Sequence, residues 1–197
     1  MTKHRLELFS DGVFAIVLTL LVLDLKLPTT HGLAELSEIA PALLVHAVTF
    51  FAVGVLWMVH HGALARVLDI KTSTLLLNLF ALFWITLLPF AAKNAAEHPQ
   101  EPLGASLMAA SCGAYLASII AMRLSAHSTI DDNPRMRRWR TGRLFLGSGI
   151  VLANFACVAV SWISPWPGYA AALATIVLLL VLPSPAEAEM RIGQEVA

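Results

Sequence analysis

Six polar or charged side chains stand in or beside the first three apolar stretches of this 197-residue chain: Arg5, Ser10, Asp11, His60, His61 and Asn78. An acidic group at membrane depth is costly unless a hydrogen-bond partner or water accompanies it, so Asp11 requires a neighbour. If the three stretches run antiparallel, all six side chains fall in one layer. We expect an interhelical hydrogen-bond cluster there, which serves either as a packing contact alone or as a latch that holds the first helix in place.

The first apolar stretch has two distinct faces when it is drawn as a helix that turns about 100° per residue. One face lies within about 60° of Ile16 and consists of Gly12, Ile16, Thr19, Leu20 and Leu23. Asp11 lies about 140° away from Ile16 by the same rotation. If the Ile16 face lines something, Asp11 does not line it, and we expect its carboxylate to face other helices.

The composition indicates which elements must position these residues. Hydrophobic residues make up 58% of the chain and charged residues 13%, and the mean hydropathy is +0.75. A soluble domain carries about 25% charged residues, and a helix needs roughly 20 apolar residues to cross a bilayer. We predict an all-α membrane protein, a single domain over residues 1–197 with six transmembrane helices at 6–27, 39–60, 74–92, 103–123, 143–163 and 166–182. Pro89 should kink the third span or end it early.

The positions of lysine and arginine predict the orientation of these spans. Of the 13 such residues, all but Lys26 and Lys93 fall on one side, and an excess of positive charge marks the cytoplasmic side. We therefore expect a multi-pass protein of the cell inner (plasma) membrane with both termini in the cytoplasm. The basic stretch 135–143 should be a cytoplasmic loop that touches anionic lipid, the alternative being a nucleic-acid patch.

Histidine and cysteine offer rival chemistry. His46 and His60 would lie about 21 Å apart on one helix, a spacing that two-haem membrane cytochromes use. His60 and His61 point about 100° apart, which argues against a metal pair. Cys112 and Cys157 lie in apolar runs and are expected to behave as small hydrophobic residues. We expect no metal, no cofactor and no enzymatic activity, because catalytic motifs are absent from the sequence.

Three pieces of sequence resemble the transmembrane protein 175 family, the lysosomal potassium channels and their bacterial relatives. The pieces are Arg5-x-x-x-Phe9-Ser10-Asp11, Trp57-x-x-His60-His61, and Asn78-Leu79 leading to Leu87-Leu88-Pro89-Phe90. The resemblance covers the first three spans, whereas the last three match only in hydropathy and length. It implies a homotetramer of six-helix subunits in which the first helix of each subunit lines a central pore.

The resemblance also implies roles for individual residues. The apolar pore constriction would consist of Ile16, Leu20 and Leu23, with Thr19 beside them. The helix-anchoring network would consist of Arg5, Phe9, Ser10, Asp11, Trp57, His60, His61 and Asn78. The Thr19 hydroxyl would either face the ion or bond back to the Ala15 carbonyl. Apart from the resemblance, Asp24 lies near the outer end of the first span, about 80° from Ile16 by rotation, and would either stand at the outer mouth and attract cations or be an ordinary interfacial residue beside Lys26.

The function that the resemblance implies is a potassium-selective cation channel of modest selectivity. The chain has no Thr-Val-Gly-Tyr-Gly filter, so a ring of aliphatic side chains would form a narrow, dry gate instead. The expected partners are other copies of the chain, membrane lipid, potassium and other monovalent cations, and no nucleic acid. The alternatives are a secondary transporter, a proton-permeable channel, a non-transporting scaffold and a haem-binding membrane protein.

Overall fold

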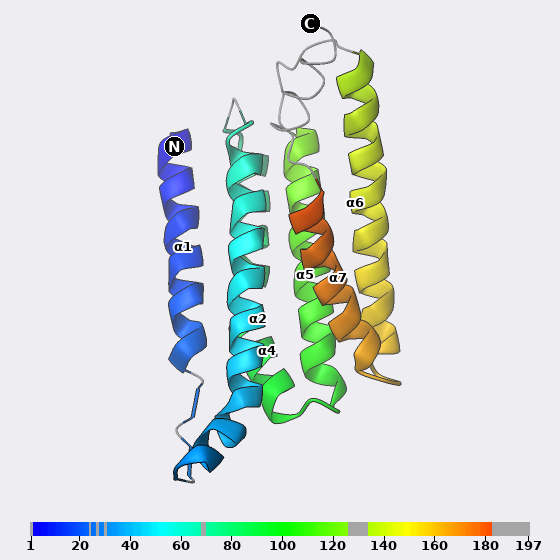
Figure 1. The fold of residues 1–197 in the computed structure, drawn as a ribbon. Coiled ribbons are helices and arrows are strands. Elements are labelled where there is room, and N and C mark those ends of the chain that lie inside the picture. Colours follow the sequence, from blue (N-terminus) through cyan, green and yellow to red (C-terminus); the bar gives the residue numbers. More distant parts are fainter. Residues whose placement is uncertain are drawn as a thin grey trace, which may run out of the picture.

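A computed structural model describes residues 2–23, 25–26, 28–29, 31–67, 70–125 and 134–182. These ranges contain helices and no strand; the helices are α1 (Lys3–Leu23), α2 (Leu33–Leu64), α3 (Thr72–Thr86), α4 (Leu88–Glu97), α5 (Pro102–Ser125), α6 (Pro134–Val160) and α7 (Trp166–Val181). The helices run up and down the bundle, with α4 continuing in the direction of α3 as one broken span, and α1 begins at the end of the bundle where α7 ends (Figure 1). The fold is therefore the all-helical, up-and-down arrangement expected of a multi-pass membrane protein.

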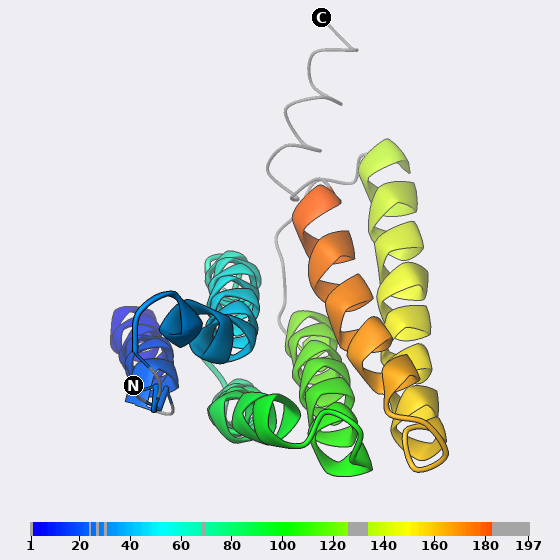
Figure 2. The same cartoon turned by 60° about the horizontal axis from the view of Figure 1, so that its bottom comes forward.

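The apolar length of the helices matches a bilayer. Within the part of the chain that the structure describes, five segments are long and apolar enough to cross a membrane, and α7 is a shorter apolar helix. Figure 2 shows α5 between α4 on one side and the α6–α7 pair on the other. The buried positions of α5 are rich in small residues, including Gly104, Ala105 and Ala109. Small side chains let helix backbones approach closely, which explains why α5 is the central helix.

The third apolar segment is split into two helices. α3 ends at Thr86, Leu87 forms a turn, and α4 begins at Leu88 with Pro89 in its first turn. A proline has no backbone N–H to give to the preceding turn, so it ends one helix and is tolerated at the start of the next. The prediction that Pro89 interrupts the third span is therefore confirmed.

Two helices are longer than the sequence predicted. α2 begins at Leu33 and contains Pro41, and Figure 1 shows its first turns set at an angle to the rest. Such a bend is the usual effect of a proline within a helix. α6 begins at Pro134, so the prediction that 135–143 is a loop was wrong. Proline suits the first helical position, and the arginines and methionine that follow are good helix formers.

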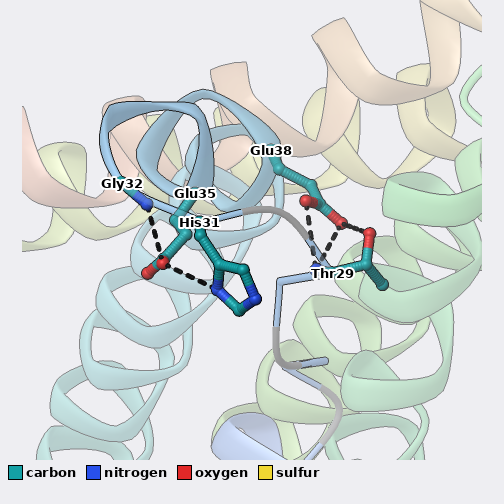
Figure 3. A network of polar contacts seen from close by, with 5 residues as sticks. All are labelled: Thr29, His31, Gly32, Glu35 and Glu38. Carbon is teal, nitrogen blue, oxygen red and sulfur yellow. Dashed lines mark hydrogen bonds and ion pairs between the residues drawn. The ribbon is translucent and has the colours of Figure 1, made fainter.

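The connection from α1 to α2 is held by two carboxylates in the first turns of α2 (Figure 3). Glu35 accepts a hydrogen bond of 3.0 Å from the backbone N–H of Gly32, whose φ of 77° is one that glycine adopts without strain. Glu38 accepts hydrogen bonds from the backbone N–H and the hydroxyl of Thr29, each at 3.0 Å. His31 Nδ1 lies 3.6 Å from Glu35. These contacts fix the direction in which the chain turns back.

Candidate functional site

A buried polar cluster joins α1, α2 and α3 near the end of the bundle where α1 begins. Asn78 Oδ1 lies 3.2 Å from Ser10 Oγ and 2.9 Å from His60 Nε2. The three side chains are at most 1% exposed. An amide oxygen only accepts hydrogen bonds, so both neighbours donate to it. Ser10 Oγ also lies 3.0 Å from the carbonyl oxygen of Leu6, one turn earlier in α1. One amide oxygen thus ties three helices together.

Two aromatic side chains enclose the ring of His60. Phe14 of α1 lies 5.3 Å from it, and Tyr115 of α5 lies 6.1 Å from it in a stacked arrangement. The Tyr115 hydroxyl donates a hydrogen bond of 2.7 Å to the Leu56 carbonyl of α2. Sequence reasoning missed both residues. A signal for Tyr115 was available, because a tyrosine inside a span needs a partner for its hydroxyl.

Asp11 makes a separate contact with α2, through a partner that the sequence did not single out for it. The Trp57 indole N–H donates a hydrogen bond of 2.7 Å to Asp11 Oδ1. His61 packs against the Trp57 ring, with 5.8 Å between ring centroids. Its rotation about the α1 axis predicts that Asp11 faces other helices, and its carboxylate does face α2. Asp11 and Trp57 form a second tie between α1 and α2, beside the buried cluster.

Two residues assigned to the anchoring network lie apart from these contacts. Arg5 is exposed, and no hydrogen bond or ion pair joins it to the described residues. Phe9 is 47% exposed. A single copy of the chain therefore leaves both side chains uncovered, although they flank the buried Ser10 and Leu6 in sequence. Any anchoring role for Arg5 and Phe9 requires a surface beyond the described part of this chain.

Replacing Trp57 with phenylalanine should weaken the attachment of α1 to α2. The ring stays, and only the indole donor to Asp11 is lost, so we expect a loss of about 1 kcal/mol from one partly exposed, charge-assisted hydrogen bond. Thermal unfolding in detergent measures the change. A double-mutant cycle with Asp11→Asn tests the pair, since a loss that is fully additive with the Asp11 change would show that the two side chains do not interact.

The opposite face of α1 is apolar and uncovered. Ile16, Leu20 and Leu23 are 59%, 44% and 75% exposed, whereas Val17 and Leu21 between them are buried. Thr19 and Gly12 lie on the same exposed face. The Thr19 hydroxyl donates a 2.8 Å hydrogen bond to the carbonyl of Ile16 and not of Ala15, so the backward bond exists but with a different partner. α1 thus carries its polar contacts on one face and an aliphatic stripe on the other.

Asp24 lies outside the described residues. Within the described ranges, no group of three or more histidine, cysteine or acidic side chains is arranged to hold a metal ion. His60 Nε2 is engaged by Asn78, and His46 packs against Phe50 at 6.2 Å. Cys112 is buried, and neither it nor Cys157 forms a disulfide. His46 thus packs against an aromatic ring, and His60 is held by a hydrogen bond.

Comparison with known proteins identifies the family. A sequence model described as the endosomal/lysosomal potassium channel TMEM175 matches residues 5–89, which contain the contacts between α1, α2 and α3 but not Tyr115. A potassium channel of Chryseobacterium sp. is 40% identical over 113 residues, which are 55% of this chain and 59% of that protein. An endosomal/lysosomal proton channel TMEM175 of Danio rerio is 37% identical over 113 residues, 51% of this chain and 22% of that protein.

The likeness to a relative from Chamaesiphon minutus extends beyond the first three helices. A potassium channel of Chamaesiphon minutus is 34% identical over 179 residues, covering 82% of this chain and 85% of that protein. The crystal structure of a lysosomal potassium-selective channel TMEM175 homolog from the same organism superposes with a TM-score of 0.69, at 25% identity and with 91% and 96% of the two chains covered. The chain is a multi-pass membrane protein that belongs to the TMEM175 family, a family of ion channels rather than enzymes.

Proposed function

We propose that this chain is one subunit of a homotetrameric, potassium-selective cation channel. The observation that carries the proposal is the division of α1 into two faces. Its polar face is tied to α2 and α3, and its aliphatic face, with Ile16, Leu20 and Leu23, is uncovered in the single chain. Four copies with α1 innermost would cover this face and place the three side chains around one axis.

The chemistry of such a constriction favours potassium modestly. A narrow aliphatic ring offers no oxygen to replace the hydration shell of an ion, so the ion must shed water to pass. Potassium holds its water less tightly than sodium, and the penalty for potassium is therefore smaller. The Thr19 hydroxyl, which bonds to the Ile16 carbonyl within its own helix, supplies at most a weak additional oxygen. Selectivity then rests on the width and dryness of the ring.

The orientation that we propose follows from charge. Lys3, Arg66, Lys71 and Arg123 lie at or near the ends of helices on the side where α1 begins, whereas Lys26 and Lys93 lie toward the opposite side. The first side would face the cytoplasm by the positive-inside rule. We place the channel in the plasma membrane on this basis, with both termini in the cytoplasm. At the opposite side, Lys26 pairs with Glu97 at 2.5 Å.

Flux through purified protein in liposomes tests the proposal. We expect a potassium flux that exceeds the sodium flux and is not coupled to a second ion. The complex in detergent should have the mass of four chains. A monomer without flux would overturn the proposal. Coupled flux would indicate a transporter, and a red or brown preparation a haem protein.

A proton-conducting channel is a second candidate, because the Danio rerio relative is named a proton channel. Proton flux that exceeds potassium flux in the same liposomes would favour it over the first proposal. The His60 cluster lies behind the aliphatic face of α1 and not on it. We therefore expect any proton flux to pass the constriction itself and to survive changes at His60 that preserve folding.

A further inference from the structure

A cavity of ≈ 220 Å³ lies between α2, α5, α6 and α7, away from the cluster on α1. Its walls are apolar and include Met58, Ile119, Leu146 and Leu179. Met58 and Leu180 on its lining are 60% and 64% exposed, so the cavity is open to the surroundings of the bundle. In a membrane, those surroundings at this depth are lipid.

Two arginines give the cavity its polar character. Arg123 is in the last turn of α5, and Arg143 lies on α6 opposite it; both line the cavity. Arg123 Nε and Arg143 Nη1 are buried and have no hydrogen-bond partner. Among the described residues that line the cavity there is no acidic side chain. Buried donors on fixed positive charges are costly without an acceptor, so this pair points to an anion.

The position of the two arginines along the bundle indicates which kind of anion they bind. Both lie toward the side of the bundle that carries most of the basic residues, where helices end and lipid headgroups begin. An apolar groove that ends in two guanidinium groups matches a molecule with a phosphate at one end and acyl chains at the other. A guanidinium binds phosphate oxygens through paired N–H donors. Arg143 also stacks over the Trp139 ring at 5.6 Å, which holds its position.

We propose that this cavity binds the headgroup phosphate and upper acyl carbons of an anionic phospholipid. The lipid would neutralise Arg123 and Arg143, and its chains would cover the apolar walls contributed by α2 and α7. It would thereby join the part of the bundle that carries α1 to the part formed by α5, α6 and α7. The proposal stands independently of which ion the channel conducts.

Native mass spectrometry of the purified full chain tests this site with defined lipids. Dioleoyl phosphatidylglycerol should be retained by the wild type, whereas dioleoyl phosphatidylcholine should be retained roughly tenfold less, since charge attraction is lost. Excess inorganic phosphate should not displace the bound lipid, because it lacks the acyl chains. Equal retention of the two lipids would overturn the proposal, and displacement by phosphate would show a free-phosphate site instead.

Variants locate the binding on the cavity. Arg123→Gln with Arg143→Gln should abolish the preference for phosphatidylglycerol, whereas Arg138→Gln should keep it, because Arg138 is exposed on α6 and does not line the cavity. If the double variant fails to fold, Gly62→Leu supplies the test. Gly62 lines the cavity, and a Cβ there meets no atom within 4 Å. Gly62→Leu should fill the cavity and reduce lipid retention while both arginines remain. Unchanged lipid retention would refute the site.

Discussion

Ile16→Ser or Leu23→Ser should make the proposed channel leakier and less selective. Ile16 and Leu23 are exposed on the uncovered face of α1, where the proposed tetramer would place them around the pore axis. A hydroxyl in place of a branched alkyl group widens the ring and lets water remain with the ion. A barrier lowered by about 1.4 kcal/mol raises flux roughly tenfold. We expect potassium flux to rise by that order and sodium flux to rise more, so that their ratio falls.

The measurement is ion flux in liposomes, with protein content normalised. Val22→Ser is the matched control, because Val22 is also exposed on α1 yet lies about 120° from Ile16 around the helix. The control should leave both flux and selectivity unchanged. If flux is unchanged in both the Ile16 and the Leu23 variants, those side chains do not form the constriction. If Val22→Ser has the same effect, the change reflects a weakened helix.

The sequence was sufficient for the features that follow from periodicity and charge. Hydropathy located the apolar segments, and Pro89 marked the break between α3 and α4. Rotation by about 100° per residue separated Asp11 from the Ile16 face, and the exposure of Ile16 and the contact of Asp11 with α2 agree with that separation. These features are properties of one helix at a time, so no knowledge of packing was needed.

The sequence did not predict which side chains of neighbouring helices contact one another. An antiparallel layout puts side chains in a common layer but leaves the rotation of each helix about its axis undetermined. Asp11 was expected to find its partner within the polar layer that includes His60, His61 and Asn78, yet Trp57, one turn before His61, makes the contact. Tyr115 was missed for a stronger reason, since no pattern indicated that α5 packs against α2 at His60. The helical start of α6 was missed because the basic stretch 135–143 was interpreted as a cytoplasmic loop.

Replacing Asn78 with leucine should separate the two roles left open for the buried cluster. Leucine preserves the volume, but His60 Nε2 loses its acceptor, and Ser10 keeps only the Leu6 carbonyl. A buried donor without a partner costs about 1–2 kcal/mol when interhelical bonds in membranes are taken into account. We expect thermal stability to fall by that amount. If the cluster holds α1 in a conducting position, then flux per folded channel should also fall severalfold.

Asn154→Leu supplies the matched control for that experiment. Asn154 is 1% exposed and donates hydrogen bonds to Thr175 Oγ1 at 2.7 Å and to the Ile150 carbonyl at 2.9 Å, in α6 and α7 and away from α1. Its loss should lower stability by a comparable amount and leave flux per folded channel unchanged. A stability loss without a flux change at Asn78 would make the cluster a packing contact only. A flux loss confined to Asn78 would show that the contacts behind α1 set the position of the pore face, because both variants remove one buried amide from the same bundle.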